Sequence, residues 1–280
     1  MLPTLSFLPI VLLIALCLLR NVKEGVFITF GVTSLLFFYW GTGFSEFAGS
    51  LVVSAFTTLN ILMIVFGAAF LFNIIESNGL ISKISTSVAQ LHPSNEIRFF
   101  LLAIGLTAFF EGVAGFGTPG AIVPLLLIAL GYNAVLAVAV VLLFNGLFAI
   151  FGAVGTPLTI GMQVPLQLGD KLIFEIGIIS TLASVFVVFL WQFYVFRIFK
   201  TYGNILEKKK LIILLYILFI IPFCLLAFVI PELATVLAAL CMLMLSVLLL
   251  KKKETRINFR PWLPYLLLAL LLLLPASLCR

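Results

Sequence analysis

Residues 99–130 read FFLLAIGLTAFFEGVAGFGTPGAIVPLLLIAL. Two apolar arms, Phe99–Phe110 and Gly120–Leu130, flank a glycine-rich centre that begins with the carboxylate of Glu111. In hydrocarbon each unpaired backbone N–H or C=O costs several kcal/mol, so irregular backbone persists there only where protein or a water-filled cavity covers it. A glycine-rich break and an acid within apolar sequence of this length therefore predict a binding site, because a passive membrane helix needs neither.

The composition excludes an ordinary soluble domain. Hydrophobic residues make up 64% of the chain and charged residues only 9%, whereas soluble domains carry roughly 25% charged residues. The apolar runs are long and do not alternate with polar residues, which favours helices over a β-barrel. At about 20 residues per crossing, we expect about eight transmembrane helices, at residues 3–20, 25–43, 51–75, 133–165, 172–197, 211–230, 233–250 and 262–280. The predicted fold is an all-α polytopic membrane protein.

Basic residues indicate the topology. All of the 16 except Lys171 and Arg280 gather in four segments: Arg20 and Lys23; Lys83 and Arg98; Arg197, Lys200, Lys208, Lys209 and Lys210; and Lys251, Lys252, Lys253, Arg256 and Arg260. The positive-inside rule places all four in the cytoplasm, with the amino terminus outside. The chain must then cross an even number of times between Arg98 and Arg197. Crossings at 133–165 and 172–197 leave zero or two for residues 98–131.

The two arms of this segment hold 12 and 11 residues, and each is too short to cross the bilayer alone. We therefore expect residues 98–131 to form a re-entrant hairpin that enters the membrane and returns. The whole chain, 1–280, is predicted to be a single transmembrane domain. Its cytoplasmic loops are expected at residues 76–98, 198–210 and 251–261.

The order glycine, threonine, proline occurs at two breaks. It stands at Gly117-Thr118-Pro119, after Gly115, and at Gly155-Thr156-Pro157 inside the broken crossing 133–165. Proline suits the first position of a helix, and threonine suits the cap before it. Two helix amino termini with free N–H groups can hold an anionic carboxylate. Gly115, Gly117, Thr118, Gly155 and Thr156 are thus candidate substrate-binding residues, the competing reading being glycine-mediated helix packing.

Two polar side chains lie deep in apolar sequence, Glu111 and Asn145. Removal from water disfavours the charged form of a carboxylate, so such a group can take up and release a proton near neutral pH. Glu111 is therefore the candidate proton-coupling residue. The alternative is a structural acid bonded to the backbone of the hairpin. Asn145 is a candidate substrate contact, or an amide that ties two helices together.

Several other functions are disfavoured. Gly115–Gly120 matches the dinucleotide fingerprint G-x-G-x-x-G, but no acidic residue follows about 20 positions later and no βαβ pattern surrounds it. The spans contain no nucleophile with a base, no metal cluster and no acidic pair, so we expect no enzyme, cofactor or metal. The net charge of +6 lies in short runs between spans, which argues against nucleic acid as a partner. The cysteines, expected to be free thiols, are Cys17, Cys224, Cys241 and Cys279.

The two breaks resemble motifs of the lactate permease family. Residues 111–119 read EGVAGFGTP and residues 151–157 read FGAVGTP, where the family carries E-G-A-A-G-F-G-[AT]-P and F-G-A-x-G-x-P. Residues 230–233, IPEL, resemble a family G-P-E-L segment. This resemblance implies secondary active uptake of lactate and related 2-hydroxymonocarboxylates such as glycolate by proton symport, in a bacterial cytoplasmic membrane.

The chain departs from the pattern of this family in two ways. Family members often have Thr and Pro after the asparagine that matches Asn145, whereas this chain has Gly146 and Leu147. Members also carry a second half with its own breaks, which implies that this chain is one repeat of an inverted-repeat transporter. We expect a truncated or split half that needs a carboxy-terminal half or a second copy. The alternatives are a carrier for another small anion and a non-transporting membrane subunit or remnant.

Overall fold

The computed structural model describes residues 5–80, 83, 92–115, 117–202, 206–250, 263 and 267. The regular elements of these residues are helices, which confirms the all-α fold. Within these residues, seven helices are long and apolar enough to cross a membrane: Val22–Tyr39, Phe44–Met63, Asn95–Ala114, Ala134–Leu166, Asp170–Thr201, Lys209–Ala227 and Pro231–Leu250. The loop expected at 251–261 and, apart from two residues, the crossing expected at 262–280 lie outside the described residues.

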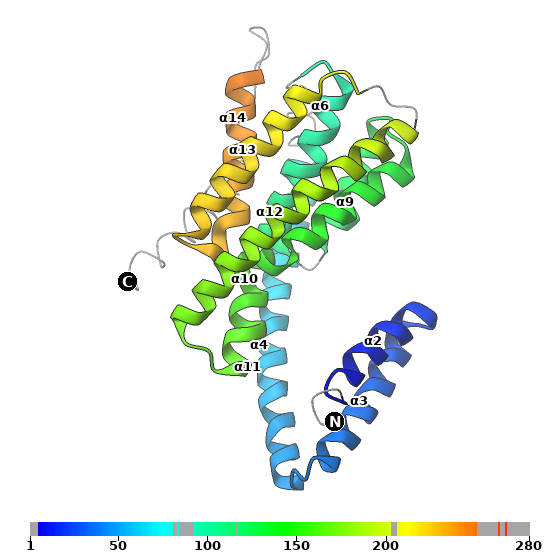
Figure 1. The fold of residues 1–280 in the computed structure, drawn as a ribbon, viewed down its shortest axis with the longest axis vertical. Coiled ribbons are helices and arrows are strands. Elements are labelled where there is room, and N and C mark those ends of the chain that lie inside the picture. The colour runs from blue at the N-terminus through cyan, green and yellow to red at the C-terminus, as the bar shows by residue number, and fades with distance from the viewer. Residues whose placement is uncertain are drawn as a thin grey trace. The chain divides into compact units, whose positions relative to one another are not determined.

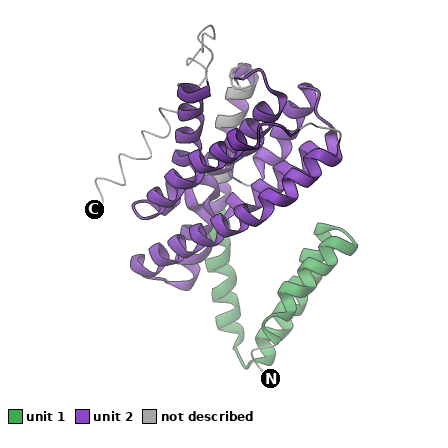
Figure 2. Ribbon diagram, turned by 45° about the horizontal axis from the view of Figure 1, so that its top comes forward, with its two compact units in different colours: residues 1–60 green, residues 61–280 purple. Residues whose placement is uncertain are grey.

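The chain divides into two compact units, residues 1–60 and 61–280 (Figure 2). Helix α4 (Phe44–Ser77) contains the boundary between them. Assignment of residues 1–280 to one transmembrane domain with three cytoplasmic loops stays a prediction.

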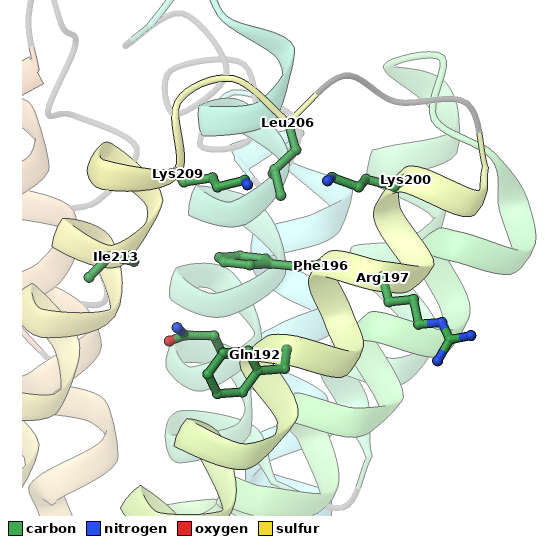
Figure 3. A pocket seen from close by; sticks show the side chains of 8 residues that line it. Gln192, Phe196, Arg197, Lys200, Leu206, Lys209 and Ile213 are labelled. Atoms are coloured by element: carbon green, nitrogen blue, oxygen red, sulfur yellow. The ribbon is translucent and has the colours of Figure 1, made fainter.

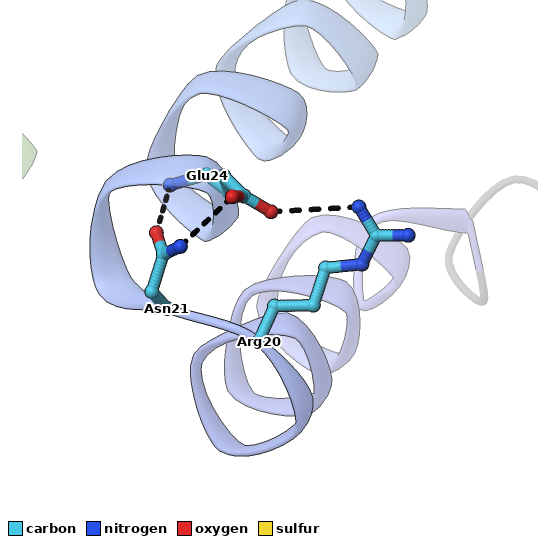
Figure 4. Close-up of polar contacts among 3 residues, drawn as sticks. All are labelled: Arg20, Asn21 and Glu24. Atoms are coloured by element: carbon cyan, nitrogen blue, oxygen red, sulfur yellow. Dashed lines mark hydrogen bonds and ion pairs between the residues drawn. The ribbon is translucent and has the colours of Figure 1, made fainter.

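The first unit begins with α2 (Leu8–Leu19) and α3 (Val22–Tyr39), which pack against each other. Asn21 lies between them and caps α3, because its side chain accepts a hydrogen bond from the Glu24 backbone N–H at 2.9 Å. The Glu24 carboxylate in turn accepts from the Asn21 side-chain amide at 2.8 Å and pairs with Arg20 at 3.4 Å (Figure 4). This exposed network fixes the sharp turn between the two helices. Helix α2 is shorter than the crossing expected at 3–20.

The second unit contains the elements that follow α4. They are α6 (Asn95–Phe100), η1 (Leu101–Leu106), α7 (Thr107–Ala114), α8 (Thr118–Ala129), α9 (Ala134–Phe148), η2 (Ala149–Phe151), α10 (Gly152–Leu158), η3 (Thr159–Gln163), α11 (Val164–Leu166), α12 (Asp170–Thr201), α13 (Lys209–Ala227), η4 (Pro231–Leu233) and α14 (Ala234–Leu250). Helices α13 and α14 lie side by side (Figure 1).

Elements α6, η1 and α7 join into one 20-residue helix, Asn95–Ala114, in which all residues except Asn95 and Arg98 are buried. Its last segment, α7, contacts α8, α9, α10 and α14. A helix that is apolar on all sides belongs in the interior of a bundle, and this central helix has that position. The first arm was expected at Phe99–Phe110 and too short to cross, which is wrong, because the helix has 20 residues. The helix begins four residues earlier because the polar groups there have partners: Glu96 accepts from the Lys208 backbone, and Arg98 donates to the Asn95 side chain.

Three segments of the second unit meet at one end. The Lys208 backbone N–H donates to the Glu96 carboxylate at 3.0 Å, and the Tyr132 hydroxyl donates to the Asn95 carbonyl at 2.6 Å. Burial raises the pKa of Tyr132 to about 12, so its hydroxyl remains a donor. The start of the central helix, the loop after α8 and the start of α13 therefore lie together. We call this the basic end, after its residues Arg98, Arg197, Lys200, Lys208, Lys209 and Lys210.

The predicted topology, with its count of crossings between Arg98 and Arg197, stays a prediction. Residues near Arg98 and Arg197 were expected on one side of the membrane, and the two segments that carry them converge at the basic end. Helix α8 contacts both η1 and α7, so the chain folds back after the central helix. Whether this hairpin is re-entrant stays a prediction.

The core and the surface are both apolar. The ten largest side chains with full burial are all phenylalanines: Phe99, Phe100, Phe109, Phe110, Phe144, Phe148, Phe151, Phe199, Phe219 and Phe223. Large apolar side chains also face outward along α12, among them Phe186, Phe189 and Phe193, which are 63%, 56% and 61% exposed. A soluble protein rarely exposes contiguous apolar surface of this kind. The exposed faces are suited to lipid.

Candidate functional site

The first break lies between α7 and α8. Gly115 has φ 62° and ψ −156°, and Gly117 has φ 75° and ψ 10°. Both values lie where residues with a Cβ are disfavoured, so glycine is needed at each position. Thr118 was expected to be the cap of the second helix, which is wrong by one residue. The cap is Gly117, and Thr118 is the first helical residue, its N–H donating to the Gly115 carbonyl at 3.0 Å.

The second break lies within α10, among the residues of the crossing expected at 133–165. Three consecutive residues have left-handed backbone: Ala153 (φ 44°), Val154 (φ 59°) and Gly155 (φ 72°). From the sequence, this conformation could be expected only at the glycine, because it costs alanine and the β-branched valine about 1–2 kcal/mol each. The Thr156 hydroxyl donates to the Ala153 carbonyl at 2.5 Å. Its role in the structure is therefore to hold the turn.

The two breaks touch each other. A Cβ atom on Gly115 would lie 2.6 Å from the backbone nitrogen of Ala153, and one on Gly152 would lie 2.6 Å from Oε1 of Glu111. Separations this short leave room only for hydrogen on those α-carbons. The carboxyl group of Glu111 thus lies against the backbone of the second break.

Glu111 is enclosed, with 2% of its surface exposed. The backbone N–H of Gly117, at the far side of the first break, is the donor that acts on its carboxyl group. Its other oxygen, Oε2, has no hydrogen-bond partner among the described residues. Thr107, one helical turn earlier on the same face, is fully buried and its hydroxyl is likewise unpartnered in the described part of the chain. Thr107 was not among the predicted site residues, although its spacing of four residues from Glu111 is a usable signal.

Asn145 lies on α9, next to the first turn of α8. A Cβ atom on Gly120 would lie 4.0 Å from its Oδ1. That oxygen is buried and has no hydrogen-bond partner within the described ranges. Asn145 is therefore near the amino terminus of α8, and its Oδ1 is available to accept a hydrogen bond.

A third segment, residues 231–236, packs on both breaks. A Cβ atom on Gly155 would lie 2.7 Å from the Cβ of Glu232, and one on Gly112 would lie 2.5 Å from Cγ2 of Val236. Sequence analysis did not place this segment in the site, although residues 230–233 were among those carrying the family resemblance. Glu232 is half-buried and lines a groove of about 390 Å³ together with Gln163, Asp170, Lys171, Ile173 and Phe174. The groove thus reaches the second break.

No group of three or more His, Cys, Asp or Glu side chains suited to a metal ion occurs in the part of the chain that the structure describes. The cysteines within that part, Cys17, Cys224 and Cys241, are free thiols. The arrangement offers one enclosed acid, two backbone breaks and unpartnered polar atoms, which is a constellation suited to binding a small polar solute.

Comparison with known proteins identifies the family. A family model described as L-lactate permease matches residues 4–265. The chain belongs to the L-lactate permease family. It is a multi-pass membrane protein of a family of permeases.

Curated relatives share the family. The L-lactate permease of Halalkalibacterium halodurans is 28% identical over 258 residues, covering 89% of this chain and 48% of the relative. The L-lactate permease of Bacillus subtilis is 29% identical over 70% of this chain and 34% of the relative. The glycolate permease of Escherichia coli is 33% identical over 36% of this chain and 18% of the relative. The chain spans about half the length of the first of these relatives. No solved structure matches the fold.

Proposed function

We propose that this chain forms one side of the pathway by which lactate or a related 2-hydroxymonocarboxylate such as glycolate crosses a bacterial cytoplasmic membrane together with a proton. Family membership and the names of the relatives, lactate permeases and a glycolate permease, support the substrate class. The observation that carries the mechanism is the enclosed carboxyl group of Glu111 at the contact between the two breaks.

Glu111 is the proposed proton carrier. A buried carboxylate without full hydrogen bonding is costly when charged; the Gly117 N–H acts on this one, and Oε2 is unpartnered within the described residues. A proton removes that cost while the site is closed. Access to water on either side of the membrane lets the proton leave. Proton binding and release are thereby linked to the opening of the site.

The two helix ends are the proposed carboxylate contacts. Gly115, Gly117 and Thr118 place the amino terminus of α8 at the site, and Gly155 and Thr156 place the restarted helix of α10 there. Each end carries a partial positive charge that attracts a carboxylate. Asn145, beside the first turn of α8, supplies an amide for the carboxylate or the 2-hydroxyl group. Glycine at the breaks allows the substrate to approach the backbone closely.

The groove lined by Lys171 and Glu232 is the proposed entrance. Glu232 packs directly against the second break, so the groove leads to it, and Lys171 is the cation that lines the groove beside the acids Asp170 and Glu232. A solute entering there meets the backbone of residues 153–156 before it reaches Glu111.

The remaining side of the pathway is proposed to come from a region equivalent to the unmatched part of the relatives. Transporters built from inverted repeats bind substrate where two repeats meet. That region is supplied by the same protein, by a second polypeptide or by a second copy of this chain.

The experiment is uptake of radiolabelled L-lactate into vesicles that contain this chain, alone or co-produced with the unmatched part of the H. halodurans permease. We expect uptake that an inward proton gradient stimulates, that glycolate inhibits and that sulfate leaves unchanged. Equal competition by sulfate would identify a carrier of another anion class. Absence of uptake in every pairing would contradict the proposal and indicate a non-transporting subunit.

A further inference from the structure

A second pocket lies at the basic end, between the carboxyl-terminal part of α12 and the start of α13. Its volume is about 470 Å³. Three cations line it, Arg197, Lys200 and Lys209, and no acidic side chain does. It is separate from the two breaks, since none of its lining residues belongs to them.

The two lysines converge on the pocket from opposite walls. Figure 3 shows the amino groups of Lys200, on α12, and Lys209, on α13, pointing toward each other above Phe196, with Leu206 between them. Arg197 points away from the pocket in the same view. Within the described ranges no ion pair joins either lysine to an acidic side chain; the salt bridge found there is Arg20–Glu24. Two positive charges without an ion-pair partner among the described residues repel each other at one pocket mouth, and an anion between them removes that repulsion.

Apart from the amide of Gln192, the lower part of the pocket is apolar. Phe193 and Ile213 line it and are 61% and 38% exposed, and further along the same two helices Phe189 and Ile217 are 56% and 43% exposed. A free inorganic anion gains nothing from such a wall. An amphiphile gains from both parts, because its charged head meets the lysines while its acyl chains cover the apolar faces of α12 and α13.

We propose that this pocket binds the phosphodiester headgroup of an anionic phospholipid, with Lys200 and Lys209 on either side of the phosphate. Basic pockets between membrane helices at the cytoplasmic surface are suited to such headgroups. The bound lipid joins the end of α12 to the start of α13. Lactate transport is not required for this inference, so the two proposals stand or fall separately.

The test is native mass spectrometry of the full chain purified in neutral detergent and titrated with phosphatidylglycerol or with phosphatidylcholine of the same acyl chains. We expect preferential retention of phosphatidylglycerol. The double variant Lys200→Gln/Lys209→Gln keeps the aliphatic stems, and we expect it to weaken phosphatidylglycerol binding about 25-fold, at about fivefold for each charge near the surface. Lys200→Arg/Lys209→Arg keeps both charges and is expected to retain the lipid.

Lys210→Gln is the matched control, because Lys210 is exposed on the same turn of α13 but does not line the pocket. It should leave binding within about twofold, as expected for a charge outside the contact. Millimolar inorganic phosphate should not displace the lipid. Equal retention of both lipids, an equal loss in Lys210→Gln, or displacement by inorganic phosphate would each overturn the proposal. Both lysines are exposed, and unchanged thermal stability of each variant confirms that folding is not the cause.

Discussion

Replacing Glu111 by Gln is expected to abolish lactate accumulation driven by a proton gradient while leaving exchange of external for internal lactate intact. The amide has nearly the shape of a protonated carboxyl group and cannot release a proton. Net symport needs that release in each cycle. In exchange, the protein returns across its cycle with substrate bound, so that no net proton moves. Both activities are measured with radiolabelled lactate in the vesicles that show uptake, the first with an imposed pH gradient and the second with lactate preloaded inside.

Glu96→Gln is the matched control, because Glu96 is the other buried glutamate of the central helix, with 7% of its surface exposed. Its carboxylate accepts from the Lys208 backbone at the basic end, and the amide oxygen of Gln can accept the same bond. Symport should survive this change. Retention of gradient-driven accumulation in Glu111→Gln would remove the proton role. Loss of exchange as well as accumulation would favour the alternative of a structural acid.

Gly115→Ala is expected to destabilise the protein more than any other single alanine substitution at the first break. The backbone of Gly115 lies in a region that is essentially reserved for glycine, at a cost of about 1–3 kcal/mol for other residues. The new Cβ atom would also overlap the backbone nitrogen of Ala153 at 2.6 Å, and overpacking adds about 1–3 kcal/mol. The expected loss in the free energy of unfolding is therefore about 2–6 kcal/mol.

Gly117→Ala separates the cost of the backbone conformation from the cost of the steric overlap. Gly117 also has positive φ, but nothing lies within 4 Å of a Cβ atom placed there. Its expected cost is the conformational one alone, about 1–2 kcal/mol. Unfolding in detergent, followed by circular dichroism against temperature, should give a clearly lower midpoint for Gly115→Ala than for Gly117→Ala. Equal midpoints would show that the two breaks do not approach each other as closely as 2.6 Å.

The helices on either side of the first break could be expected from the sequence because their signals are local. Long apolar runs indicate helices, and a glycine-rich interruption between them indicates a reversal. The length of the first arm was underestimated because Glu96 and Arg98 looked like the end of a span. Their partners, the Lys208 backbone and the Asn95 side chain, depend on tertiary structure and are invisible in the spacing of residues.

The second break was predicted at the right place but not with the right conformation. Gly155 signals positive φ, whereas Ala153 and Val154 adopt it against their intrinsic preference. Such strain persists only where surrounding contacts enforce it, and here the first break and residues 231–236 press against the turn. Likewise, the hydroxyl of Thr156 was expected to cap a helix, but it bonds to the Ala153 carbonyl because the left-handed turn brings that oxygen within reach.

The contact between the breaks could not be read from the sequence at all. Gly115 and Gly152 are far apart along the chain, and nothing in their spacing shows that one α-carbon lies against the other. The packing of Glu232 against Gly155 could not be read from the sequence either, since the two residues belong to separate elements, η4 and α10. Composition and motifs located the parts of the site, and packing determined how they meet.

The central claim, that Glu111 at the meeting of the two breaks carries the proton that moves with lactate, is tested most directly by proton uptake on lactate binding. The measurement uses the transport-competent protein in weakly buffered detergent solution, with a pH indicator dye and parallel measurement of bound lactate. We predict that lactate binding removes protons from solution in the wild-type protein, and that Glu111→Gln binds lactate with no such uptake. Equal proton uptake by the two proteins would contradict the account.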